Sequence, residues 1–182
     1  MSGKLRIGII GCGDFLRLRA ADLLSSRQVE VKLLYSPVNS ANAERYAEIF
    51  GANAADSPEA IINDPEIDVV CVFVPPFVRK EYVLAAAKAG KQIVATKPLA
   101  ADLSDAREMT EAVEQAGVRC GVIYRRTNNP VIEAYKEIFS GGEFGKLALY
   151  KQDWLHHYPT WNRWATDPKK MVAHSWTLCC II

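Results

Sequence analysis

The sequence has 182 residues, of which 49% are hydrophobic and 24% are charged, and its formal net charge is +1. This balance is typical of an ordinary globular protein, and it predicts neither a nucleic-acid-binding nor a membrane-binding surface. The length suffices for one well-buried domain and an appendage, but not for two full domains. The first apolar run is interrupted by Gly8, Gly11 and Gly13, so we expect no signal peptide and no membrane span.

The cysteines carry no metal-ligand spacing. Three of the five, Cys12, Cys71 and Cys120, lie far apart, and Cys179 and Cys180 are adjacent. An odd number of scattered cysteines is typical of reduced thiols, which predicts a cytoplasmic protein without a metal site.

The first half of the chain alternates short apolar runs with segments of helical spacing. Residues 5–10 form an apolar run that is too short for a helix and is bounded by glycines, which predicts a buried strand. The next predicted elements are a helix over 14–26, a strand over 29–35, a helix over 40–50, a strand over 52–55, a helix over 57–63 and a strand over 68–74.

Pro75 and Pro76 end the strand over 68–74, because proline cannot donate a hydrogen bond to a ladder. Further along, Ser104 is the predicted N-cap of a helix that has Asp105 in its first turn. The predicted elements here are a helix over 78–89, a strand over 92–95, a helix over 104–116 and a strand over 118–124. Strands alternating with helices predict an α/β fold: a doubly wound parallel sheet with helices on both faces.

The pattern changes after Tyr124. A helix is predicted over 130–139 and a strand over 146–155, and we place the boundary between a first domain over 1–125 and a second region over 126–182. Aromatic side chains then crowd a segment without a clear period: Trp154, Tyr158, Trp161, Trp164 and Trp176. Aromatic residues at this density predict a partner surface that buries them, such as a second copy of the chain.

A glycine-containing turn lies between the first predicted strand and the first predicted helix. Gly11 permits a tight turn and Gly13 permits close approach of a phosphate, where backbone N–H groups at a helix N-terminus hold the pyrophosphate of a dinucleotide. Asp14 and Phe15 follow, and Leu16 takes the place of the third glycine of the usual fingerprint. We therefore predict these five residues as a cofactor-binding loop of a Rossmann sheet; the alternative is a pair of turn glycines without a ligand.

The second predicted strand ends in Tyr35-Ser36-Pro37, where an acidic residue would be expected to bind the adenosine ribose of NAD. Ser36 leaves room for a 2′-phosphate, which favours NADP over NAD, with Arg45 nearby. The alternative interpretation is that cofactor affinity has weakened.

Two more turns fall at the carboxyl ends of predicted strands, the edge at which open α/β sheets bind ligands. They are Val74-Pro75-Pro76 and Thr96-Lys97-Pro98. As an ammonium, Lys97 could polarise a substrate carbonyl or stabilise an alkoxide during hydride transfer. The alternative is a solvated surface lysine.

In order and spacing these motifs resemble the Gfo/Idh/MocA oxidoreductases, over residues 4 to about 168. The motifs are Gly11-x-Gly13, Val74-Pro75-Pro76, the helix through 85–91, Lys97-Pro98-Leu99-Ala100, and Tyr124-Arg125-Arg126 with Asn129-Pro130. The resemblance implies an N-terminal Rossmann domain that binds NAD or NADP along the edge formed by Gly11, Ser36 and the turns 74–76 and 96–98. It also implies a C-terminal α/β domain on an open antiparallel sheet. It also implies hydride transfer to or from a sugar, an inositol or a related polyol, with Lys97 as the matched catalytic residue.

The sequence departs from the family pattern at three positions near these turns. Thr96 replaces the glutamate of the usual Glu-Lys-Pro, Val74 replaces the threonine of the usual Thr-Pro-Pro, and Arg79 stands where a histidine is common.

The resemblance stops before the family's glycine-rich segment and its acid-and-histidine motif. His174 falls too early to match the catalytic histidine, and His156 and His157 match no family motif. Because the second domain normally completes the substrate pocket, we expect impaired turnover from this short chain. The alternative is a non-catalytic nucleotide-binding or assembly module whose aromatic segment docks a partner.

Overall fold

The computed structural model describes residues 3–124 and 130–146. The chain divides into two units, Met1–Ile123 and Tyr124–Ile182. The predicted strand over 146–155, the clustered aromatic residues and the three histidines lie outside the described residues, apart from Lys146 at the start of that strand.

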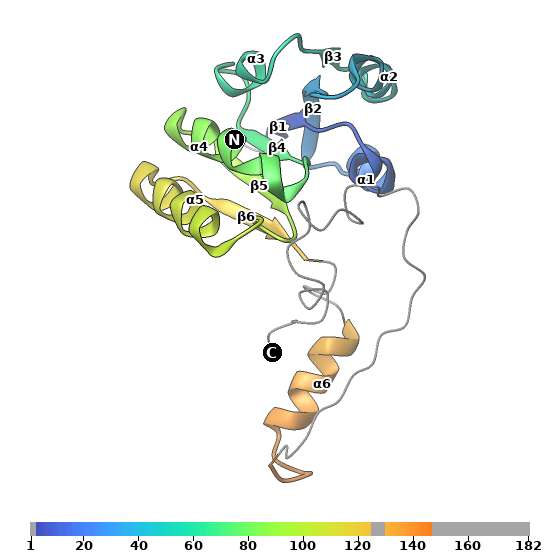
Figure 1. The fold of residues 1–182 in the computed structure, drawn as a ribbon. Helices are drawn as coiled ribbons and strands as arrows, with labels where there is room; N and C mark the ends of the chain where they lie inside the picture. The colour runs from blue at the N-terminus through green and yellow to red at the C-terminus, as the bar shows by residue number, and fades with distance from the viewer. Residues whose placement is uncertain (1–2, 125–129, 147–182) are drawn as a thin grey trace. The chain divides into compact units, whose positions relative to one another are not determined.

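The first unit is built on one six-stranded sheet with the order β3-β2-β1-β4-β5-β6 (Figure 1). Every neighbouring pair of strands is parallel. The strands are β1 (Leu5–Ile10), β2 (Val29–Tyr35), β3 (Asn53–Ala54), β4 (Val69–Val72), β5 (Gln92–Thr96) and β6 (Cys120–Ile123). The helices between them are α1 (Asp14–Ser25), α2 (Ser40–Phe50), α3 (Pro58–Ile62), α4 (Arg79–Lys88) and α5 (Leu103–Ala116), with a short 3-10 turn, η1 (Pro76–Val78).

The direction in which strands are added reverses between β1 and β4. The chain first builds outward through β2 and β3, and then returns to place β4 on the other side of β1. This is the strand order of a Rossmann sheet, and ligands bind such sheets at the carboxyl ends of the strands beside the reversal. The predicted fold class is confirmed.

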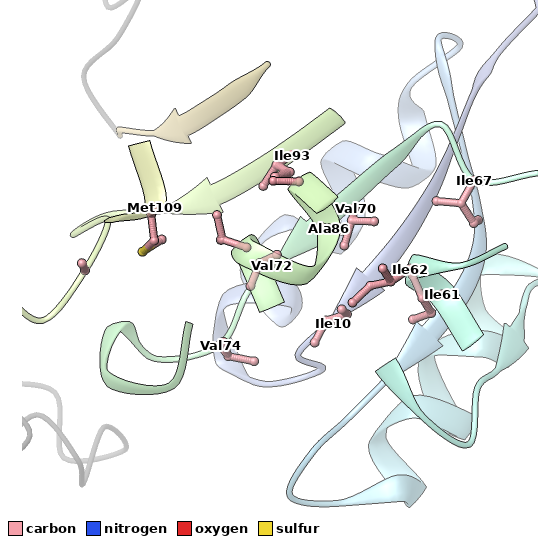
Figure 2. Close-up of a cluster of buried hydrophobic side chains, with 13 residues drawn as sticks. Ile10, Ile61, Ile62, Ile67, Val70, Val72, Val74, Ala86, Ile93 and Met109 are labelled. Carbon is pink, nitrogen blue, oxygen red and sulfur yellow. The ribbon is translucent and has the colours of Figure 1, made fainter. Parts of the chain in front are cut away.

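Two apolar clusters bury the two faces of the sheet. On one face, α1 and α2 contribute buried side chains such as Leu16 and Tyr46. On the other, α3, α4 and α5 pack Ile61, Val83 and Met109 against the strands. Figure 2 shows this cluster, with Ile61 and Met109 among its labelled side chains. Strands β1, β2, β4, β5 and β6 therefore place apolar residues on both of their faces, which explains the nearly continuous apolar runs of β1 and β4.

Capping residues set the ends of helices α2 and α5. The Asn39 side chain accepts a hydrogen bond from the Ala41 amide at the start of α2, and Gly51 ends that helix in the left-handed region, with φ at +63°. The prediction of Ser104 as the N-cap of α5 is wrong. The cap is Asp102, whose carboxylate accepts from the Asp105 amide at 2.9 Å, so the helix begins one residue earlier than predicted.

The second unit contains α6 (Pro130–Ser140), which confirms the predicted helix over 130–139. Its apolar side chains include Tyr135, Ile138 and Phe139, all partly exposed. Within residues 3–124 and 130–146, no helix is long and apolar enough to cross a membrane, and no group of acidic, histidine and cysteine side chains could hold a metal ion.

Candidate functional site

The loop after β1 turns sharply at Gly11. Its amide donates to the carbonyl of Tyr35 at the end of β2, with 2.8 Å between nitrogen and oxygen, and its φ is +110°. A Cβ at this position would come within 2.7 Å of the carbonyl carbon of Phe73, just beyond β4. Glycine is therefore required here by the fold itself, for both its backbone conformation and its close approach to Phe73.

At Gly13, by contrast, the fold does not require glycine. It is the N-cap of α1, it makes no side-chain capping bond, and its φ of −97° is open to any residue. A Cβ here would meet no atom within 4 Å. The described part of the chain gives no internal reason for glycine at this exposed position, whereas a phosphate at a helix N-terminus would need the space. The loop therefore fits the pyrophosphate of a dinucleotide.

The next three residues divide between the loop and the core. Asp14 forms an exposed ion pair with Arg17 at 3.3 Å, close to the start of the helix. Phe15 packs edge-to-face on Phe73, with 4.9 Å between ring centres. Leu16 is fully buried in the cluster under α1, so its side chain serves packing between helix and sheet.

The end of β2 lies next to the glycine loop. The carbonyl of Tyr35 accepts from the Gly11 amide and from the Cys12 thiol, at 2.8 Å and 3.5 Å respectively. Ser36 follows directly, and its hydroxyl accepts from the Asn39 amide at 3.4 Å. The predicted ribose-binding position is thus joined to the predicted phosphate-binding loop through one backbone carbonyl. Arg45 is exposed on α2.

The turns after β4 and β5 are held together by a buried guanidinium, that of Arg79, whose role the sequence alone does not predict. The Arg79 side chain donates to the carbonyl of Val74 at 2.6 Å, and to the carbonyl and hydroxyl of Thr96, each at 2.5 Å. It also donates to the carbonyls of Pro98 and Leu99. The two predicted turns therefore meet at one side chain at the carboxyl edge of the sheet.

Arg79 is only 1% exposed. Burial lowers the pKa of its guanidinium from 12.5 to about 10, so it remains a cation at neutral pH. The signal in the sequence was the pair of departures from the family pattern at residues 79 and 96, which the fold brings into hydrogen-bonding contact. The predicted site residue Thr96 uses its hydroxyl on Arg79.

The other residues of these turns take distinct positions. Pro76 is buried and begins η1, and Pro75 is half-buried before it. Lys97 is exposed, between a buried Thr96 and a half-buried Pro98. Its ammonium is therefore presented outward from a turn whose backbone is fixed from inside.

Comparison with known proteins identifies the family. The family model described as "Oxidoreductase family, NAD-binding Rossmann fold", that of the Gfo/Idh/MocA proteins, matches residues 5–124. The chain belongs to this family. As a Gfo/Idh/MocA protein it contains the family's NAD-binding domain, from β1 to the residue after β6.

Curated relatives extend the match beyond that domain. The chain is 28% identical over 152 residues to scyllo-inositol 2-dehydrogenase (NAD(+)) of Bacillus subtilis, covering 83% of this chain and 44% of the relative. It is 30% identical over 141 residues to 1,5-anhydro-D-fructose reductase of Ensifer adhaerens, covering 78% of this chain and 42% of the relative. This Gfo/Idh/MocA chain thus spans less than half the length of these two enzymes.

Among solved structures, the fold is similar to that of a 3-ketoreductase from Actinomadura kijaniata in complex with NADP. The TM-score is 0.71 at 26% identity, with 79% of this chain and 46% of the other covered. A dehydrogenase from Bordetella pertussis in complex with NADH and UDP-GlcNAcA has a TM-score of 0.72 at 23% identity, a likeness of fold alone. These neighbours hold different nicotinamide cofactors and so decide no preference for this Gfo/Idh/MocA chain.

Proposed function

We propose that residues 1–125 bind a nicotinamide dinucleotide, and that the protein acts as an oxidoreductase on a sugar, an inositol or a related polyol. The single observation that carries the cofactor proposal is the open space at Gly13, at the N-terminus of α1 beside the strand reversal. The substrate class rests on the relatives, whose names refer to an inositol and an anhydrosugar. We also retain the prediction of a cytoplasmic protein.

Each predicted residue has a part in this proposal. The backbone around Gly11, Gly13 and Asp14 would hold the pyrophosphate, with Phe15 and Leu16 anchoring the loop to the core. Ser36 would face the adenosine ribose, and the turns 74–76 and 96–98 would line the nicotinamide side. Once bound, the dinucleotide supplies hydride transfer.

Lys97 is the proposed catalytic residue. Its ammonium is exposed at the carboxyl end of β5, the edge where open α/β sheets bind ligands. A cation here would donate a hydrogen bond to the substrate oxygen whose charge changes during hydride transfer. Residues 126–182 would be the beginning of a substrate domain, and a complete substrate pocket would also need the part of the relatives that this chain does not span.

The first experiment is isothermal titration of the purified chain with NAD, NADP and their reduced forms. Gly13→Val would crowd the pyrophosphate, so binding should weaken at least about a hundredfold, close to 3 kcal/mol. Gly121→Val is the matched control, because Gly121 is an exposed glycine in β6 where a Cβ would also meet no atom within 4 Å. Equal binding to both variants, or no binding by a folded wild-type chain, would overturn the cofactor proposal.

The proposed preference for NADP, which rests on Ser36, is tested in the same titration with Ser36→Asp. A carboxylate at this position would accept hydrogen bonds from a ribose and repel a 2′-phosphate. We expect NADPH affinity to fall and NADH affinity to rise, each by about tenfold, or about 1.4 kcal/mol. Unchanged selectivity would place the adenosine ribose elsewhere.

A further inference from the structure

Arg79 is a buried cation with an unusual set of partners. In residues 3–124 and 130–146 no carboxylate forms an ion pair with it, and its hydrogen bonds go to backbone carbonyls and to one hydroxyl. The Nε atom is buried and has no hydrogen-bond partner within the described part of the chain. Burying an unpaired charge is costly, so a side chain retained in this state needs a reason beyond core packing.

The hydrogen-bond acceptors of Arg79 show which turns its guanidinium connects. One nitrogen, Nη2, joins the Val74 carbonyl to the Thr96 hydroxyl, and so connects the turn after β4 to the end of β5. The other, Nη1, donates to the carbonyls of Thr96, Pro98 and Leu99. These three carbonyls lie on both sides of Lys97 in the chain. The backbone around Lys97 is thus held from within, while its ammonium stays exposed.

We infer that Arg79 is a positioning residue, which fixes the turn carrying Lys97 against the turn that follows β4. This inference rests on the proposed function at one point, which is the catalytic role of Lys97. The buried position of Arg79 in the first turn of α4 excludes a direct contact with bulk solvent, so it acts through the backbone that it binds.

Arginine is suited to this task and other cations are not. A guanidinium presents its N–H donors in a rigid planar fork, whereas an ammonium offers three donors at a single point. The five acceptors come from two turns and are shared between two separate nitrogens. Lysine at residue 79 would keep the charge but could not span both turns at once.

The departure at Thr96 follows from the same arrangement. The Thr96 side chain is buried and accepts from Nη2 at 2.5 Å. A hydroxyl is a neutral acceptor that fits beside the guanidinium within the turn. Two of the three departures from the family pattern, those at residues 79 and 96, therefore form one interacting pair.

The test is nitrogen-15 relaxation of the full 182-residue chain, comparing wild type with Arg79→Ala and Arg79→Lys. In wild type we expect order parameters of about 0.85 for the amides of Lys97, Leu99 and Ala100, typical of a rigid backbone. In both variants these should fall below about 0.6, with β1 and β2 unchanged. Lys80→Ala is the control: Lys80 is the neighbouring residue on α4, and its ammonium pairs on the surface with Asp105 and Glu108.

Chemical rescue separates positioning from general stability. Arg79→Ala leaves the acceptors in place, so millimolar guanidinium, far below the molar concentrations that unfold proteins, should restore the order parameters, while equal potassium chloride should not. If Arg79→Ala does not fold, Arg79→Lys carries the test by its order parameters alone. Unchanged order parameters at Lys97 and Leu99, or an equal loss across β1 and β2, would overturn the inference.

A second readout couples Arg79 to Lys97. Because the turn 96–98 is proposed to line the nicotinamide side, we expect Lys97→Ala to weaken NADPH binding about tenfold in wild type. In the Arg79→Lys background the same change should weaken it less than about twofold, since the ammonium is then no longer held in place. Equal effects in the two backgrounds would overturn the inference. The relaxation measurement needs no cofactor, so failure of NADPH to bind at all would count against the proposed function and leave the positioning role to be decided by relaxation.

Discussion

Gly11 and Phe73 lie backbone against backbone, so that a Cβ on residue 11 would stand 2.7 Å from the Phe73 carbonyl carbon and 2.9 Å from its oxygen. The contact arises because β1 and β4 are adjacent parallel strands, and the Phe73 amide donates to the Ile10 carbonyl at 2.8 Å. The loops that leave these two strands diverge from this point. The site edge is therefore built on a contact that tolerates only glycine at residue 11.

The two glycines of the loop should respond differently to alanine. Gly11→Ala introduces both a backbone clash and a side chain at positive φ, and should lower the free energy of unfolding by about 2–4 kcal/mol. Gly13→Ala should change it by less than about 1 kcal/mol, because its backbone suits any residue and its surroundings are open. Urea unfolding monitored by circular dichroism measures both, and equal losses would contradict this division of roles.

Leu16 should not be replaceable by the glycine that the dinucleotide fingerprint has at this position. Its side chain is fully buried between α1 and the sheet. Leu16→Gly should cost about 3–5 kcal/mol, from the cavity and the lower helix propensity together. Leu18→Gly is the control, because Leu18 on the same helix is 51% exposed and should lose only about 1 kcal/mol. Similar losses for the two variants would show that α1 moves to close the cavity.

The ion pair between Arg6 and Asp68 should make stability depend on acid pH. The Arg6 side chain approaches the Asp68 carboxylate to 2.9 Å. Hydrogen bonds from the side chain and the amide of Arg6 lower the pKa of Asp68 from 3.8 to about 2. Because the folded-state pKa is the lower one, ionised Asp68 stabilises the fold above about pH 4, and this stabilisation disappears as the pH falls toward 2. The free energy of unfolding should fall less steeply over this range in Asp68→Asn than in wild type. Parallel curves in urea titrations at several pH values would argue against the pairing.

Two buried thiols should resist alkylation while the protein is folded. Burial raises the pKa of Cys12 and of Cys71 to about 12, so at pH 8 only about one molecule in 10⁴ carries a thiolate at either position. Iodoacetamide at pH 8, followed by peptide mass spectrometry, should leave both unmodified in the native chain and modify both in denaturant. Rapid labelling of Cys71 without denaturant would show that β4 opens locally.

The sequence predicts an element's bounds well where the signals that set them lie within the element's own segment. The predicted bounds of β1, β2 and α2 agree with the structure, because apolar runs, helical spacing and a terminal glycine are visible within each segment. The cap of α5 was misplaced because Asp102 and Ser104 are both favourable N-cap residues, and only the backbone path shows which side chain reaches an unpaired amide.

The candidate site was determined by sequence only in part. Spacing alone placed Gly11, Gly13 and Lys97 at strand ends, since a parallel sheet brings such ends to one edge. Spacing could not show that Gly11 is required by Phe73 whereas Gly13 faces open space, because the two contacts involve residues far apart in the chain. Spacing likewise could not reveal that Arg79 is buried. Its acceptor, the Thr96 carbonyl, lies 17 residues away, and only the packing of α4 against β5 brings this cation and this carbonyl together.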